Sequence, residues 1–241
     1  AASDVYKRQS LVETHLDKKG FTKIELFNTF RRLAPSTQVK IKKHLASIYR
    51  CFLKKNQLQI FFNNENLEFN NPEILEAPVA YSDEEPEKIL KWEKTISFST
   101  RSGGKVEGFV ALRKNGSFAQ GGLSLFRRNR LIMGSDEEKY KPRSIFGASN
   151  SFQTLRVFGE LHLEGYQVTF SKDKFDFRDN EEEEFLEKLK EEINSSPLRI
   201  LKQAEAYREK KATKKEIKHA EEQIKKVFAV SYTHLTLPTN S

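Results

Sequence analysis

The chain has 241 residues, a charged fraction of 32% and a formal net charge of +8. Its hydrophobic fraction of 37%, with 19 phenylalanines, is large enough to build a core. A single cysteine excludes an internal disulfide, and no apolar run approaches the ~18 residues of a membrane-spanning helix. The composition therefore predicts a protein of the reducing cytoplasm without a membrane partner.

Both ends of the chain look unlike the rest. Residues 1–9 (AASDVYKRQ) and 231–241 (SYTHLTLPTNS) resemble translated sequencing-adapter sequence, and the only methionine is Met133, deep in the chain. We therefore leave both ends out of the fold argument and expect the chain to be a fragment of a longer protein. The remaining length of about 220 residues allows one large or two small domains.

The first predicted elements are a short strand and a helix. Residues 22–27 alternate in polarity as a strand does, whereas residues 36–54 place apolar side chains at helical spacing. Ser36 or Thr37 is suited to cap this helix. Cys51 lies inside the helix without a neighbouring acid or histidine in the sequence, so we expect an inert, packed thiol.

Two hairpins follow. Residues 58–62 and 67–69 flank the loop Asn63-Asn64-Glu65-Asn66, and asparagine tolerates the positive φ of a turn. Residues 92–100 and 105–113 form the second hairpin, closed by Ser102-Gly103-Gly104. The Gly-Gly-Lys of this turn is not a phosphate-binding loop, because alternating strand residues and no helix come after it.

The centre of the chain predicts two further strands, residues 121–132 and 156–169, joined by a polar loop. A helix over residues 181–194 comes next, with Asn180 as its cap and an acidic first turn. Ser196-Pro197 begins another helix, whose polar later part is expected to leave the body as an arm. Together these elements predict an α+β fold with a mostly antiparallel sheet and a C-terminal helical arm.

Two polar groups in the predicted strands could carry chemistry. Glu160, His162 and Glu164 fall on one face of a strand, as a metal or acid–base cluster would, but a solvated strand face gives the same pattern. Arg128-Asn129-Arg130 could bind phosphate or form an ion-pair network at a sheet edge. The sequence favours the structural alternative for both groups.

The order of elements from residue 121 to residue 177 resembles the transducer domain of GHKL-type ATPases. This group contains gyrase B, MutL, the heat-shock chaperone ATPases and the microrchidia proteins, and bacterial microrchidia-like members are the nearest match. The resemblance rests on Arg128-Asn129-Arg130-Leu131-Ile132, on the Gly-Glu-Leu of the following strand, and on the turn at residues 169–175. The turn departs from the family pattern, because Phe170 stands where histidine is common and Lys174 where aspartate is common.

The resemblance implies a role for one lysine of this turn. In these ATPases a transducer lysine enters the ATP site and meets the γ-phosphate, which makes Lys172 the expected catalytic and ATP-binding residue and Lys174 the alternative. Thr22 resembles a residue near the phosphates in the last strand of the ATP-binding domain, although Phe21 interrupts that motif. No residue of this chain is expected to bind a metal.

The family's remaining ATP-site motifs, the Glu-x-x-x-Asn helix and the Asp-x-Gly-x-Gly turn, are absent from the sequence. We therefore expect ATP and Mg²⁺ to bind in the intact parent protein and not to this fragment alone. The implied layout assigns residues 10–57 to the end of the ATP-binding domain plus a connector helix, residues 58–180 to the transducer, and residues 181–230 to a helical region. The missing ATP-binding domain, a homodimer partner and DNA are the expected partners.

A different class of function competes with this interpretation. The net charge of +8 is also typical of a stand-alone basic nucleic-acid-binding module without nucleotide coupling. No aromatic RNA-binding signature or zinc-knuckle spacing supports that alternative.

Overall fold

The structure, a computed structural model, describes residues 20, 22–25, 33–82, 88–149, 151–207, 221, 222 and 225. The chain divides into two compact units, residues 1–41 and residues 42–241. The division falls within the first helix, α1 (Pro35–Lys54). The part of α1 from Lys42 onward therefore belongs with the sheet described below.

In the first unit, residues 22–25 lie outside any helix or strand. The strand predicted over residues 22–27 is therefore wrong for its described part, and its remaining residues lie outside the described ranges. Helix α1 begins at Pro35, one residue before the predicted start. Proline suits this position, because its missing N–H would have no partner in the first turn of a helix.

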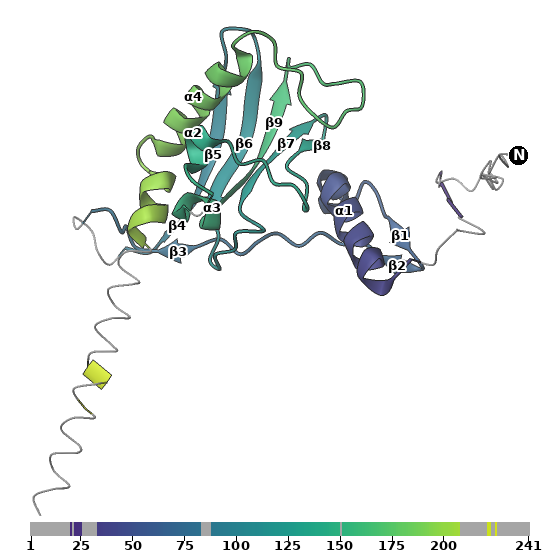
Figure 1. Ribbon diagram of the computed structural model, residues 1–241, viewed down its shortest axis with the longest axis horizontal. Helices are drawn as coiled ribbons and strands as arrows, with labels where there is room; N and C mark the ends of the chain where they lie inside the picture. The colour runs from purple at the N-terminus through teal and green to yellow at the C-terminus, as the bar shows by residue number, and fades with distance from the viewer. Residues whose placement is uncertain are drawn as a thin grey trace, which may run out of the picture. The chain divides into compact units, whose positions relative to one another are not determined.

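Two small two-residue pairings and one large sheet form the strands of the second unit (Figure 1). β1 (Phe61–Phe62) pairs with β2 (Glu65–Asn66) through a turn in which Asn63 and Asn64 have the predicted positive φ, at 50° and 63°. The turn is two residues long, because Glu65 and Asn66, predicted as loop, already form the second strand, which was predicted over residues 67–69. β3 (Glu76–Ala77) pairs with β4 (Leu90–Lys91).

The main sheet has five strands in the order β5-β6-β9-β7-β8. These are listed in chain order: β5 (Glu93–Ser99), β6 (Lys105–Leu112), β7 (Gly122–Arg127), β8 (Arg130–Met133) and β9 (Val157–Glu164). All neighbours are antiparallel except β7 and β9, which are parallel. With its helices, this mostly antiparallel, mixed sheet confirms the predicted α+β class.

The core lies between one face of this sheet and helix α4 (Glu181–Asn194), which runs along β5 with α2 (Arg143–Phe146) beside it (Figure 1). From the sheet, Ile96, Val110 and Leu161 are fully buried, and from α4 so are Phe185 and Leu189. Their burial follows from the alternation of each strand and the 3.6-residue period of the helix. The predicted bounds of this helix, residues 181–194, are confirmed.

Three predictions about local structure are corrected. Residues 121–132 are not one strand but the β7–β8 hairpin, because Arg128 and Asn129 adopt positive φ values of 49° and 64° and reverse the chain. The last strand ends at Glu164, since Gly165 has a φ of 85° and turns the chain away. Asn180 precedes α4, but its side chain makes no capping hydrogen bond.

Two further differences concern helices. The loop between β8 and β9 contains α2 and α3 (Phe152–Arg156), and Arg156, predicted as the first strand residue, completes α3. The helix predicted to start at Pro197 begins instead at Ile200 and is described to Tyr207. Most of the predicted C-terminal arm, like both excluded ends, lies outside the described residues. Among the helices that the structure describes, none combines the length and apolar character needed to cross a membrane.

Candidate functional site

The turn that carries Lys172 is a short hairpin tip fixed by its own hydrogen bonds. Val168 and Phe175 form an antiparallel bridge at its base. The Lys172 amide donates to the Thr169 carbonyl at 2.9 Å, and the Thr169 amide donates to the Lys174 carbonyl at 3.0 Å. Because these bonds close the loop on both sides, its backbone is ordered before any ligand arrives.

The carboxylate of Asp173 braces the same turn from inside. It accepts hydrogen bonds from the hydroxyls of Thr169, at 2.8 Å, and of Ser171. The bond from Ser171 has the larger effect and the bond from Thr169 the smaller, and both hold the pKa of the Asp173 carboxyl below its ordinary value. The only acid inside the loop is therefore occupied by hydroxyls rather than by a lysine.

Lys172 and Lys174 are both exposed at this tip, on either side of Asp173. Among the described residues, the Lys172 ammonium has no hydrogen bond or ion pair. Lys174 differs, because it lies close enough to Asp173 to contribute to the lowered pKa of that carboxyl. Lys172 is thus the freer of the two cations, and its backbone has a φ of 57°, a value unusual for a side-chain-bearing residue.

A fully exposed aromatic ring completes the turn. Phe170 is 104% exposed, whereas Phe175 at the base of the turn is buried. Phe175 contacts the ring of Tyr166 edge-on and stacks on the ring of Phe177. Thr22, the third residue expected to contact ATP, is exposed and belongs to the other compact unit.

The Glu160 region is an interface rather than a solvated strand face. Glu160 lies on the sheet face that α1 covers, with its side chain 12% exposed, and its carboxylate is 3.0 Å from both Arg50 Nε and Lys54 Nζ. The Arg50 guanidinium lies over the rings of Phe126 and Phe69, at 4.6 and 5.0 Å from their centroids. The predicted solvated face is therefore wrong for Glu160, because α1 packs against it.

His162 shares this interface, whereas Glu164 is exposed at the strand end. The imidazole stacks on Phe126 with a centroid distance of 5.1 Å, and its burial lowers its pKa. The Cys51 thiol is buried, as predicted, and this burial raises its pKa. Among the described residues, no group of His, Cys, Asp or Glu side chains is arranged to hold a metal ion.

The Arg128-Asn129-Arg130 segment is the turn and strand start of the β7–β8 hairpin, not a continuous strand. The preceding residue, Arg127, stands directly opposite Arg130 in the register. Sequence analysis did not single out Arg127, although three arginines within the tetrapeptide Arg-Arg-Asn-Arg were a visible signal.

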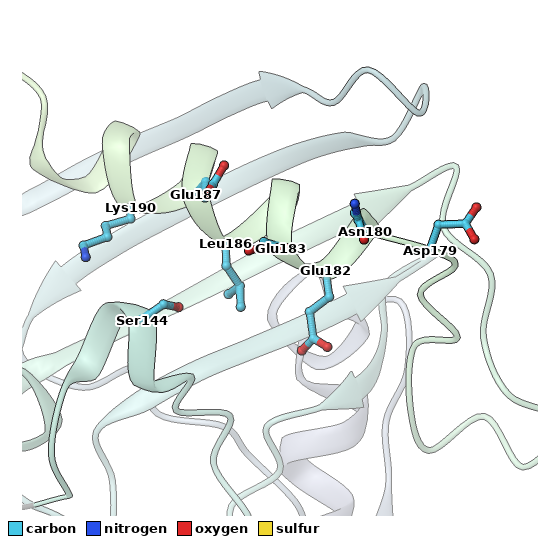
Figure 2. A pocket seen from close by; sticks show the side chains of 8 residues that line it. All are labelled: Ser144, Asp179, Asn180, Glu182, Glu183, Leu186, Glu187 and Lys190. Carbon is cyan, nitrogen blue, oxygen red and sulfur yellow. The ribbon is translucent and has the colours of Figure 1, made fainter.

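A groove of about 540 Å³ lies beside the first three turns of α4, where Ser144 of α2 also lines it. Figure 2 shows Glu182 and Leu186 projecting from α4 on the side where Ser144 of α2 lies. Its other lining residues are Asp179, Asn180, Glu183, Glu187 and Lys190. Four carboxylates facing one ammonium repel phosphate groups, so this groove is unsuited to a nucleotide.

The turn at residues 169–175 is thus a hydrogen-bonded loop that presents an unpaired ammonium. No protein-family model matches the chain, and no curated protein matches it either.

Proposed function

We propose that this chain is the transducer part of a GHKL-type ATPase, in which it couples ATP binding and hydrolysis to a change in a dimer or in a bound nucleic acid. The observation that carries the proposal is the ordered turn with the unpaired Lys172 ammonium. A lysine free of protein partners is available to an external anion, and the closed loop lowers the entropy lost when it binds.

The chemistry expected of Lys172 is electrostatic. Bound ATP would supply the terminal phosphoryl group, and the ammonium would stabilise the negative charge that develops on it. The adenine and magnesium contacts would come from an ATP-binding domain outside the sequence of this chain. Withdrawal of the turn after hydrolysis would then separate the two domains.

Asp173 has a supporting role in this proposal. An aspartate beside a phosphate-binding lysine would neutralise it or repel the phosphate. Here the Asp173 carboxylate is directed to Thr169 and Ser171, which keeps it from pairing with Lys172. Asp173 is therefore a positioning residue that orders the loop.

The test uses the full reading frame that contains this chain, with ATP hydrolysis as the first measurement. Lys172→Ala should lower turnover by roughly ten- to a thousandfold, the effect of removing one charge-stabilising donor, with a smaller change in ATP affinity. Lys172→Gly should lose as much turnover while keeping the turn, because glycine adopts the φ of 57° without strain. Lys172→Arg should rescue only partly, since a planar guanidinium does not replace a compact ammonium.

Lys174→Ala is the matched control, because it removes a neighbouring exposed lysine of the same turn. Its turnover should stay near wild type. Loss of activity in Lys174→Ala with full activity in Lys172→Ala would move the contact by two residues. Full activity in both variants, or a reading frame without an Asp-x-Gly-x-Gly turn upstream, would remove the nucleotide-coupled function.

A further inference from the structure

The β7–β8 hairpin ends in three arginines whose charges nothing in the described part of the chain neutralises. Arg127 closes β7, Arg128 occupies the turn, and Arg130 opens β8. Arg128 and Arg130 are exposed, and Arg127 is half-buried. None of the three guanidinium groups makes a hydrogen bond or an ion pair with a described residue. The ion-pair network considered from the sequence is therefore not formed among these residues.

Each of these arginines is unfavourable for the fold at its own position. Arg127 and Arg130 are direct cross-strand partners, and like charges placed directly opposite each other destabilise a strand pair. Arg128 has a φ of 49° in a two-residue turn, where asparagine, aspartate or glycine is strongly preferred. Residues that oppose local stability in this way are expected where the sequence serves a ligand.

The surroundings hold charges of both signs, but none of them pairs with the three arginines. Cys51 packs with Phe126 and Leu131, which places the last turn of α1 beside the hairpin. Lys55 follows this turn and is exposed. Glu160 lies opposite Ser124 in the parallel register and already pairs with Arg50 and Lys54. Glu164, two residues beyond His162 on the same strand, is the acid of β9 closest to the tip in this register, but it forms no ion pair with the three arginines.

We propose that the hairpin tip of Arg127, Arg128 and Arg130 binds the phosphate backbone of a nucleic-acid duplex without reading its sequence. Guanidinium groups match phosphate oxygens in a bidentate geometry, and a two-stranded ribbon is narrow enough to enter the major groove. This surface goes beyond the proposed ATP-coupled function and does not depend on it.

The apolar side chains of the hairpin argue against the other polyanions. Phe126 and Leu131, which flank the arginines, are 0% and 5% exposed and point into the interface with α1. A membrane-binding hairpin needs an exposed apolar anchor, and stacking on single-stranded bases needs an exposed ring. The described tip offers neither, so a duplex backbone is the ligand that its exposed groups fit.

The experiment measures binding of a fluorescently labelled 20-base-pair DNA duplex to the full chain, without ATP, at several salt concentrations. Arg127→Gln/Arg130→Gln should lower affinity about tenfold at low salt and reduce the slope of log K against log salt by about 1.8, the change for two lost phosphate contacts. Arg128→Asn should also weaken binding. Arg143→Gln, which removes an exposed arginine on α2, is the matched control and should bind like wild type.

Thermal unfolding of the same variants separates a binding role from a structural one. Arg127→Gln/Arg130→Gln and Arg128→Asn should melt at or above the wild-type temperature, because they remove like-charge repulsion and an unfavourable φ. A lower melting temperature, or an unchanged salt slope in the double variant, would overturn the proposal. So would tighter binding to polyglutamate or to phosphatidylserine vesicles than to the duplex, which would identify an acidic protein or a membrane as the partner.

Discussion

The Arg50 guanidinium of α1 lies 3.0 Å from the Glu160 carboxylate of β9, across an interface where Arg50 is 3% exposed. Burial lowers the pKa of Arg50, and the charge of Glu160 opposes that effect. Two aromatic rings cover the guanidinium. One carboxylate, shared with Lys54, therefore compensates the buried positive charge of this arginine.

Removing that carboxylate should be strongly destabilising. Glu160→Gln leaves the buried Arg50 charge without a counter-ion, and breaking a buried pair on one side costs about 3 to 5 kcal/mol. Urea denaturation of the variant measures this loss. Glu164→Gln, on the exposed end of the same strand, should stay within about 0.5 kcal/mol of wild type. Equal stability of both variants would mean that α1 is not held by this carboxylate.

The stability of the chain should fall as the pH drops from 7.5 to 5. Burial lowers the pKa of His162 from its ordinary value of 6.5, so the unfolded chain binds more protons there than the folded chain does. The stabilisation that the neutral His162 side chain gives the folded state is complete above pH 6.5. It is lost as the pH falls toward the lower pKa of His162 in the folded chain. The charged groups that act on this imidazole are Glu160, Lys55, Arg50 and Glu107.

Melting temperatures at steps of pH measure this dependence. His162→Phe keeps a ring against Phe126 but cannot be protonated, so its curve should be flatter over this range. A wild type and a variant with parallel pH curves would show that His162 does not titrate with folding.

Gln203 should be a strong determinant of stability although it is polar. It is 0% exposed, and its amide accepts from the Ala80 N–H at 2.7 Å and donates to the Pro78 carbonyl at 2.9 Å. Gln203→Leu fills the space but leaves the buried Ala80 N–H without a partner, which costs about 1 to 3 kcal/mol. Lys202→Leu, at the exposed neighbouring position, should change the unfolding free energy by less than about 0.5 kcal/mol. Urea denaturation compares the two.

The turn that presents Lys172 should loosen without Asp173. Asp173→Ala removes the acceptor of the Thr169 and Ser171 hydroxyls, and loss of a charge-assisted bond of this kind should raise local opening about tenfold. Hydrogen exchange at the Lys172 amide reports that opening. Asp176→Ala, in the same hairpin, should leave the rate unchanged. Equal exchange in both variants would mean that backbone bonds alone hold the loop.

Sequence analysis predicted the elements whose signals are local. The helix over residues 181–194 and the turns at Asn63-Asn64 and Ser102-Gly103-Gly104 are where periodicity and turn chemistry placed them. The β7–β8 turn was missed because an arginine occupies the position where a turn residue is expected. Arg128, which hides the turn from a sequence-based prediction, is also one of the three arginines of the proposed binding surface.

Contacts between distant segments could not be predicted in this way. Alternation placed Glu160 on the polar face of its strand. That face is an interface only because α1 packs against it, and Lys54 of α1, which contacts Glu160, lies 106 residues earlier in the chain. Gln203 reads as one more polar helical residue, since its partners lie 123 and 125 residues away. The sequence could not decide between Lys172 and Lys174 as the phosphate-binding residue for the same reason. The choice depends on which side chains the Asp173 carboxylate contacts.

The position of β9 has a consequence for synthesis. This strand is the last of the five to leave the ribosome, yet it lies between β6 and β7 in the finished sheet. Until Glu164 has emerged, the chain holds two separate hairpins, β5–β6 and β7–β8, each with an unpaired inner edge that another chain could join. A ribosome that pauses within β9 would therefore expose nascent chains to mutual aggregation, and a chain that ends before Val157 would lack the strand that unites the two halves.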